Sequence, residues 1–150
     1  MKLAKKRADM PWFLLLGEFM SSSATWTTKY STVTLIVLSK SDNGDRSPYE
    51  LYVTDYTKND QVIPMRSNFW PSSLAETVLK IKTWDAALPV GKTMEQGRIY
   101  RMKNVRMIVG RSGGLEAKIC ERKFSEPLDD GGRTDFDAHL RKFLERKREE

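Results

Sequence analysis

The residues of this chain best suited to chemistry are basic and aromatic side chains in extended segments. Five basic residues and no acid occur between Arg98 and Leu115, together with Tyr100 and Asn104. Alternate residues of a strand lie on one face. This rule places Lys80, Lys82 and Trp84 together on one strand face, and Tyr52, Thr54 and Tyr56 together on another. Basic groups bind phosphates and aromatic rings stack on bases. The pattern predicts binding of a single-stranded nucleic acid, although charged residues are also expected on any solvated strand face.

Residues for catalysis or metal binding are scarce. Cys120 is the only cysteine and His139 the only histidine, which excludes an intrachain disulfide and a cysteine-based zinc site and removes most triad chemistries. The paired carboxylates lie in hydrophilic turns, Asp42 with Asp45 and Asp129 with Asp130. The sequence holds no Walker-type loop or dinucleotide fingerprint. We therefore expect no enzyme, no cofactor and no metal site.

The composition indicates one folded domain with an anionic partner. The 150 residues are 39% hydrophobic, enough for a globular core, and 26 basic residues against 20 acidic ones give a net charge of +6. The basic residues ahead of Trp12–Leu16 imitate a signal peptide, but Gly17 and Glu18 interrupt the apolar run. No segment approaches the roughly 18 apolar residues of a membrane span. We expect an intracellular protein in a reducing compartment, without a membrane.

Five segments have the composition and alternation of strands, and they must position the basic and aromatic residues. They are residues 32–39, 49–56, 77–84, 98–109 and 115–121. Turn clusters join the first pair at 41–45 and the last pair at 110–114. In this scheme Leu51 and Val53 point into the core, Trp84 is expected in the core, and Asp55 and Asp85 are turn caps.

Two other segments complete the predicted architecture. A loop of about twenty residues, 57–76, contains Phe69 and Trp70, and the short segment 86–97 has room for one or two helical turns. Thr134 is placed to cap a C-terminal helix whose apolar face holds Phe136, Leu140, Phe143 and Leu144. The predicted domains are a basic tail at 1–11, a barrel at 12–123, a linker at 124–133 and the helix at 134–150. Five strands with a short helix after the third predict an all-β-dominated OB-fold barrel, and an SH3-like barrel also fits.

Several motifs resemble the protection-of-telomeres family. The stretch Tyr49–Asn59 (YELYVTDYTKN) is similar to the second OB fold of that family's single-stranded DNA-binding region, most of all in its fungal branch. Further similar motifs follow in the same order: Phe13–Phe19 before the first strand, and then Pro64-Met65, Trp84-Asp85, Met102–Arg106 and Gly114–Glu116. Together they cover roughly residues 12 to 122.

This resemblance implies a nuclear protein of chromosome ends. Such a domain binds the G-rich 3′ overhang of telomeric DNA as a single strand and contributes to end protection and telomere maintenance through length control, without enzymatic activity. The family's neighbouring OB fold, and the regions through which it recruits shelterin-type proteins, are not present in these 150 residues. We expect a monomer.

The resemblance also places DNA across the barrel face and between three loops, at residues 39–48, 57–76 and 110–114. The first loop lacks aromatic residues, leaving Lys40 and Arg46 as phosphate contacts. The basic residues expected at the DNA backbone are Lys40, Arg66, Lys80, Lys82, Arg101, Lys103, Arg111 and Lys118. Those expected to stack on bases are Tyr52, Tyr56, Phe69 and Trp70. Those expected to bond base edges are Thr54, Asn59 and Asn104.

Two other functions fit the same predicted fold. A general single-stranded DNA- or RNA-binding OB fold of the replication-protein type has the same basic face but binds oligonucleotides of any sequence alike. A protein-interaction OB fold instead docks a partner through Phe69, Trp70 and the C-terminal helix. Binding of oligonucleotides, and its dependence on sequence and salt, separates these readings.

Overall fold

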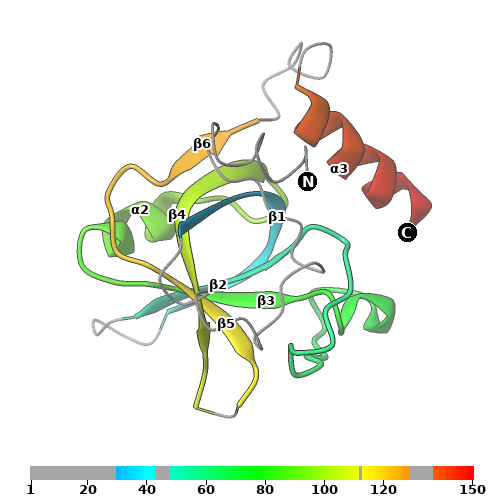
Figure 1. Cartoon of the computed structure of the whole chain (residues 1–150), viewed down its shortest axis with the longest axis horizontal. Coiled ribbons are helices and arrows are strands. Elements are labelled where there is room, and N and C mark those ends of the chain that lie inside the picture. The colour runs from blue at the N-terminus through cyan, green and yellow to red at the C-terminus, as the bar shows by residue number, and fades with distance from the viewer. Residues whose placement is uncertain (1–29, 43–47, 112, 129–136) are drawn as a thin grey trace, which may run out of the picture.

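The computed structural model describes residues 30–42, 48–111, 113–128 and 137–150. All five predicted barrel strands are present within these residues: β1 (Tyr30–Asp42), β2 (Tyr49–Thr54), β3 (Leu79–Thr83), β4 (Ile99–Val109) and β5 (Leu115–Ile119) (Figure 1). Residues 1–29, which include the expected basic tail and the motif at 13–19, lie outside the description, as does Arg46.

The strands close into a barrel with the connectivity of an OB fold. Strand β1 pairs antiparallel with both β2 and β4, β2 pairs antiparallel with β3, and β4 pairs antiparallel with β5. A parallel pairing of β3 with β5 completes the circle. This arrangement confirms the predicted OB fold.

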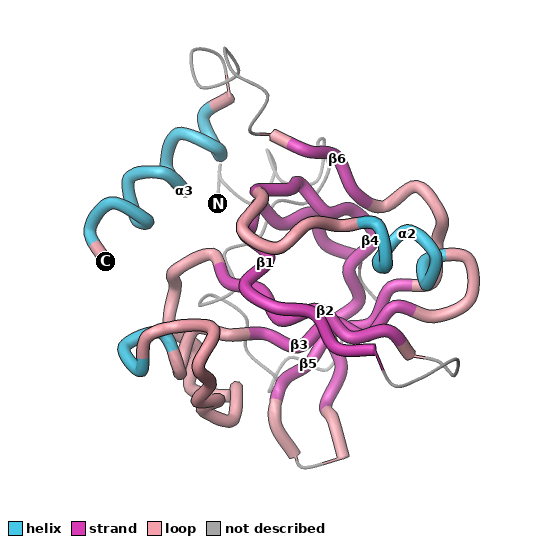
Figure 2. Tube along the Cα trace, turned by 180° about the vertical axis from the view of Figure 1, so that it is seen from behind, coloured by secondary structure: helices cyan, strands magenta, loops and turns pink. Residues whose placement is uncertain are grey.

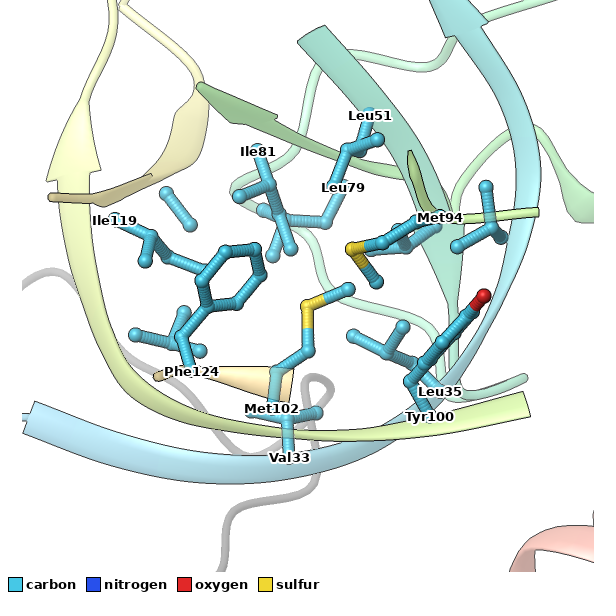
Figure 3. Close-up of a cluster of buried hydrophobic side chains, with 14 of the residues drawn as sticks. Val33, Leu35, Leu51, Leu79, Ile81, Met94, Tyr100, Met102, Ile119 and Phe124 are labelled. Carbon is cyan, nitrogen blue, oxygen red and sulfur yellow. The ribbon is translucent and has the colours of Figure 1, made fainter. Parts of the chain in front are cut away.

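Inward-facing residues of every strand fill the barrel. Leu51 and Val53 of β2 and Ile81 of β3 are fully buried, as the alternation predicts. Figure 3 shows side chains from all five strands converging on Met102 and Phe124 in the barrel interior. Trp84 lies outside this core and is half-buried, so its expected place in the core is wrong. It follows the last residue of β3, where the barrel wall ends.

Helix α2 (Ala87–Thr93) lies between β3 and β4, where the sequence predicts a short helix. Its buried Ala87, and Leu88 and Val90, pack against the barrel core. The helix approaches β3 closely at Gly91, where a Cβ atom would lie 2.8 Å from Thr83 Oγ1. A short 3-10 helix, η3 (Ser72–Leu74), lies in the β2–β3 loop, residues 55–78.

The predicted linker at 124–133 is wrong in its first part. Phe124 is 1% exposed in the barrel core, and β6 (Ser125–Pro127) pairs antiparallel with β4. Leu128 is buried as well. A three-residue strand of sequence Ser-Glu-Pro has no alternation to reveal it, which is why composition alone suggested a linker. The remaining residues, 129–133, lie outside the description.

Helix α3 (Ala138–Glu149) packs on the outside of the barrel (Figures 1 and 2). Leu140 and Phe143 are buried against Ile36 of β1 and Ile99 of β4, as the amphipathic pattern predicts. The N-cap is Asp137, whose Oδ1 accepts a hydrogen bond of 3.0 Å from Leu140 N, instead of the expected Thr134. Thr134 and Phe136 lie outside the description. Among the described residues, no helix is long and apolar enough to cross a membrane.

Candidate nucleic-acid interface

Outward side chains of β2, β3, β5 and β4 form two adjacent rows. The strand register aligns Glu50, Lys82, Lys118 and Arg106 in one row, which we call the lysine row. The other row contains Tyr52, Lys80, Glu116 and Ile108, and we call it the tyrosine row. Together the two rows are the basic face, which holds four basic and two acidic residues.

Salt bridges link the two rows. Lys82 Nζ lies 3.2 Å from Glu116 Oε1, and Lys80 Nζ lies 3.9 Å from Glu50 Oε2. The two lysine side chains retain about a quarter of their exposure. The two lysine ammonium groups are thus exposed enough to reach a phosphate, whereas the Glu116 carboxylate, at 13% exposure, depends on Lys82 for charge compensation. Lys118 Nζ lies 5.7 Å from the centroid of the Trp84 ring.

Aromatic rings continue the basic face at the end of β2. The half-buried Tyr52 ring lies 5.9 Å from the Trp70 ring, at an interplanar angle of 33°, and Lys80 Nζ lies 5.9 Å from the Tyr52 centroid. Burial, and then the nearby Glu50 and Glu116 carboxylates, raise the pKa of Tyr52. Its hydroxyl therefore remains a donor at neutral pH, and Glu50 Oε1 accepts from it at 3.4 Å. Part of this half-buried ring and its hydroxyl are therefore open to a bound base.

The β2–β3 loop contacts the region of the tyrosine row at two places. At one end it places Trp70 against Tyr52, and at the other Gln61 O accepts a 2.8 Å hydrogen bond from Leu115 N. Ile63 lies so close to Gly114 that a Cβ atom there would be 2.6 Å from Ile63 Cγ1. Phe69 is 62% exposed on this loop and is available for stacking. The loop and the β4–β5 hairpin thus meet at one edge of the basic face.

Three of the expected contact residues are buried and serve the fold instead. Thr54 is fully buried, and its hydroxyl donates to Thr77 Oγ1 and accepts from Tyr56 N. Asn59 Oδ1 accepts from Gln61 N inside the loop. The Trp70 ring is 8% exposed, and its Nε1 donates to Met65 O at 2.8 Å. Their burial leaves these three side chains without a surface for DNA, because the loop folds over the end of β2.

Two other residues that were expected to contact DNA interact with helix α3 or its N-cap instead. Both oxygens of Asp137 accept hydrogen bonds from Arg101, at 2.7 and 2.5 Å. The Tyr56 ring lies 5.5 Å from the Phe143 ring, and Arg146 Nε donates to Asp55 O at 2.8 Å. Arg101 and Tyr56 therefore lie under the helix, on a different side of the barrel from the lysine row.

The remaining residues expected to contact DNA lie on the basic face, on the loops beside it, or elsewhere on the barrel. Lys80, Lys82, Lys118 and Tyr52 lie on the basic face, and the exposed Arg66, Phe69 and Arg111 are on the two loops beside it. Lys40 Nζ instead donates to Lys92 O on α2. Asn104, in a left-handed conformation with φ of 60°, donates to Glu121 Oε2. Lys103 is exposed next to it on β4.

Four residues of this region are not among the expected contacts. Trp84 shares the alternation of Lys80 and Lys82, but its expected place in the core kept it off that list. Arg106 follows from the pairing of the β4–β5 hairpin, which sets it opposite Lys118. Glu50 and Glu116 lie within the family-like motifs, but only the strand register and the salt bridge show that both adjoin Lys82.

Removal of the Tyr56 ring is expected to destabilise the fold. Tyr56 joins the cluster around Phe143 to the loop cluster of Trp70, Leu74 and Val78. Because the ring is half-buried, we expect Tyr56→Ala to lower the free energy of unfolding by about 2 kcal/mol, measured by urea denaturation. Tyr56→Phe, which keeps the ring, should stay close to wild type. Equal stability of the alanine variant and wild type would contradict this packing.

The bond between Asp137 and Arg101 predicts a loss of stability in acid. Burial alone would raise the pKa of Asp137, but hydrogen bonds from Arg101 and from the Leu140 amide, with the charges of Arg101 and His139, lower it below 3.8. A carboxylate whose pKa is lower in the folded state stabilises the protein above its unfolded pKa. That stabilisation should disappear as the pH falls from about 5 through the folded-state value.

Asp137→Asn tests this prediction, because asparagine still caps a helix but does not titrate here. Thermal melts between pH 7 and pH 3 should show a smaller loss of Tm in the variant than in wild type, with the two curves converging in acid. Parallel curves would contradict the prediction.

Comparisons with known proteins agree with this fold. No protein-family model matches the chain. No curated protein matches it either. Among solved structures, Schizosaccharomyces pombe Pot1pC bound to the single strand CGGTTACGGT is similar at a TM-score of 0.67 and 24% identity, over 91% of this chain and 96% of that one. Fission yeast Pot1 with single-stranded DNA is similar at 0.69 and 23% identity, over 98% of this chain. This chain spans 47% of that Pot1 chain.

A third similar structure is the Cdc13 DNA-binding domain in complex with a single-stranded telomeric DNA 11-mer. Its TM-score is 0.51 and its identity 17%, over 81% of this chain and 78% of that domain. The resemblance to the protection-of-telomeres family is thus confirmed as likeness of fold. At these identities the comparisons establish an OB fold shared with Pot1 and Cdc13.

Proposed function

We propose that this chain is a monomeric OB-fold domain that binds the G-rich single strand of telomeric DNA in the nucleus. It would protect the chromosome end and regulate telomere length by occupying the overhang, without catalysing a reaction. The observation that carries the proposal is the basic face, where partly exposed lysines and the Tyr52 ring lie side by side. The outer surface of β1 and the start of β4 is covered by α3 instead.

The similar structures support the proposal. Pot1pC and Pot1 are bound to single-stranded DNA, and the Cdc13 domain is bound to a telomeric single strand. The sequence motifs that resemble the protection-of-telomeres family include four residues of the face itself, namely Glu50, Tyr52, Arg106 and Glu116. In this proposal an adjacent OB fold of the full-length protein is a partner of the domain, and shelterin-type proteins bind through other regions of that protein.

The chemistry of the basic face suggests how a strand would lie. Phosphates would follow the lysine row, where Lys82, Lys118 and Arg106 align, and bases would lie over Tyr52 and reach Phe69. Each neutralised phosphate of a single strand contributes about −0.7 to the slope of log affinity against log salt. The lysine row alone therefore predicts a slope of about −2.

Fluorescence anisotropy tests the proposed function. The labelled strand CGGTTACGGT is titrated with the protein at two salt concentrations, beside its complement, the duplex and a shuffled strand of the same composition. Salt-sensitive binding confined to the G-rich strand supports telomeric recognition. Equal affinity for every single strand would favour the general single-strand binder. Absence of binding at low salt would leave the protein-interaction OB fold.

A further inference from the structure

A carboxylate lies within the basic face, at a position where phosphate would be repelled. The Glu116 side chain is only 13% exposed, and its Oε1 is buried and accepts no well-directed hydrogen bond within the described part of the chain. The Lys82 ammonium, 3.2 Å away, is the charged group paired with it. A buried carboxylate needs a compensating partner, and here that partner is a lysine of the row proposed to bind phosphates.

Gly110 holds this carboxylate in place. A Cβ atom at Gly110 would lie 2.3 Å from Glu116 Oε2 and 2.8 Å from Oε1. The carboxylate therefore rests on the backbone of the β4–β5 hairpin, at the edge where the hairpin meets the β2–β3 loop. Its neighbours in the tyrosine row are Lys80 and Ile108.

We propose that Glu116 is a specificity-determining residue that accepts hydrogen bonds from the Watson–Crick edge of one guanine. This inference rests on the proposed function. When Lys82 moves to a phosphate, the Glu116 carboxylate loses its partner and must gain donors. A carboxylate only accepts hydrogen bonds. Guanine places two donors side by side on that edge, N1–H and the 2-amino group, whereas adenine, cytosine and thymine each place one donor there beside acceptors.

The geometry of the two rows fits this exchange. Phosphates held by the lysine row leave the bases to project over the tyrosine row, where Tyr52 provides a ring and Glu116 provides the acceptor. The negative charge of Glu116 also repels the backbone from the tyrosine row, which fixes the strand's orientation across the face. Preference for guanine then follows from one carboxylate.

Glu116→Gln tests the assignment, because glutamine keeps the shape but replaces one of the two acceptor oxygens with an NH2 donor, which cannot pair with a guanine donor. Each guanine of CGGTTACGGT is replaced in turn by inosine, which lacks the 2-amino group, and affinities are measured by anisotropy. We expect one position at which wild type loses about fivefold or more, and at which Glu116→Gln shows a ratio near one. For the unmodified strand, Glu116→Gln should lose about 5- to 150-fold.

Two further variants control for charge and folding. Glu95→Gln makes the same change of charge between α2 and β4 and should retain the inosine effect. Gly110→Ala leaves Glu116 in the chain but displaces its carboxylate, and should reduce the inosine effect even if Glu116→Gln fails to fold. An inosine effect that persists unchanged at every position in both Glu116→Gln and Gly110→Ala overturns this assignment alone. Failure of wild type to bind the parent strand overturns the proposed function as well.

Discussion

Replacing Tyr52 with alanine is expected to weaken binding of the G-rich single strand by about 1–3 kcal/mol. The half-buried ring belongs to the basic face, where the Trp70 ring and the Lys80 ammonium each lie 5.9 Å from its centroid. A base that stacks on it would also lie beside a positive charge, which strengthens the contact in a partly desolvated site. Anisotropy titrations at fixed salt measure the change. Because stacking carries no charge, the salt slope should stay at its wild-type value.

Two control variants test whether the loss of affinity is specific to the Tyr52 ring. Tyr52→Phe keeps the ring and should bind within a few-fold of wild type. Tyr49→Phe, on the same strand, alters a buried residue of the core cluster and should leave affinity unchanged. Wild-type affinity in a folded Tyr52→Ala variant would exclude the ring from the DNA interface.

Replacing Phe143 with alanine is expected to lower the free energy of unfolding by about 3 kcal/mol. The Phe143 side chain is fully buried between α3 and the barrel, in one cluster with Ile36, Ile99 and Leu128. Its removal leaves a cavity and also removes the aromatic ring that the Tyr56 ring contacts. Urea denaturation followed by tryptophan fluorescence measures the loss, and the m-value shows whether α3 still unfolds with the barrel.

The matched control for Phe143 lies on the same helix. Arg141 is exposed on α3, so Arg141→Ala should change stability by less than about 0.5 kcal/mol. If Phe143→Ala were as stable as Arg141→Ala, the docking of α3 on the barrel would be contradicted.

Local alternation was sufficient to predict the barrel and several of its outward-facing side chains. Leu51 and Val53 face the core and Tyr52 faces outward because neighbouring residues of a strand point to opposite sides. The same rule placed Lys80 and Lys82 together on the outside. It then failed for Thr54, because the β2–β3 loop returns over the end of β2 and buries an outward position.

Contacts between distant segments explain the other differences. Arg101 has the spacing of a surface residue on a strand, but its partner Asp137 follows 36 residues later, at the start of α3. The roles of the two carboxylates of the basic face could not be predicted without the strand register. The register sets Glu50 beside Lys82 and places Glu116 within reach of the same lysine. The linear sequence shows how many charged residues a segment has, but it does not show which of them form ion pairs with one another.

An NMR titration of isotope-labelled protein with CGGTTACGGT tests the central claim most directly. If DNA lies on the basic face, the largest amide shifts will occur at Tyr52, Lys80, Lys82 and Lys118, and at Phe69 and Arg111 on the bordering loops. Amides of α3, at Leu140 and Phe143, will change little, because this helix covers another side of the barrel. Shifts concentrated on α3 and β1, with the basic face unchanged, would contradict the account.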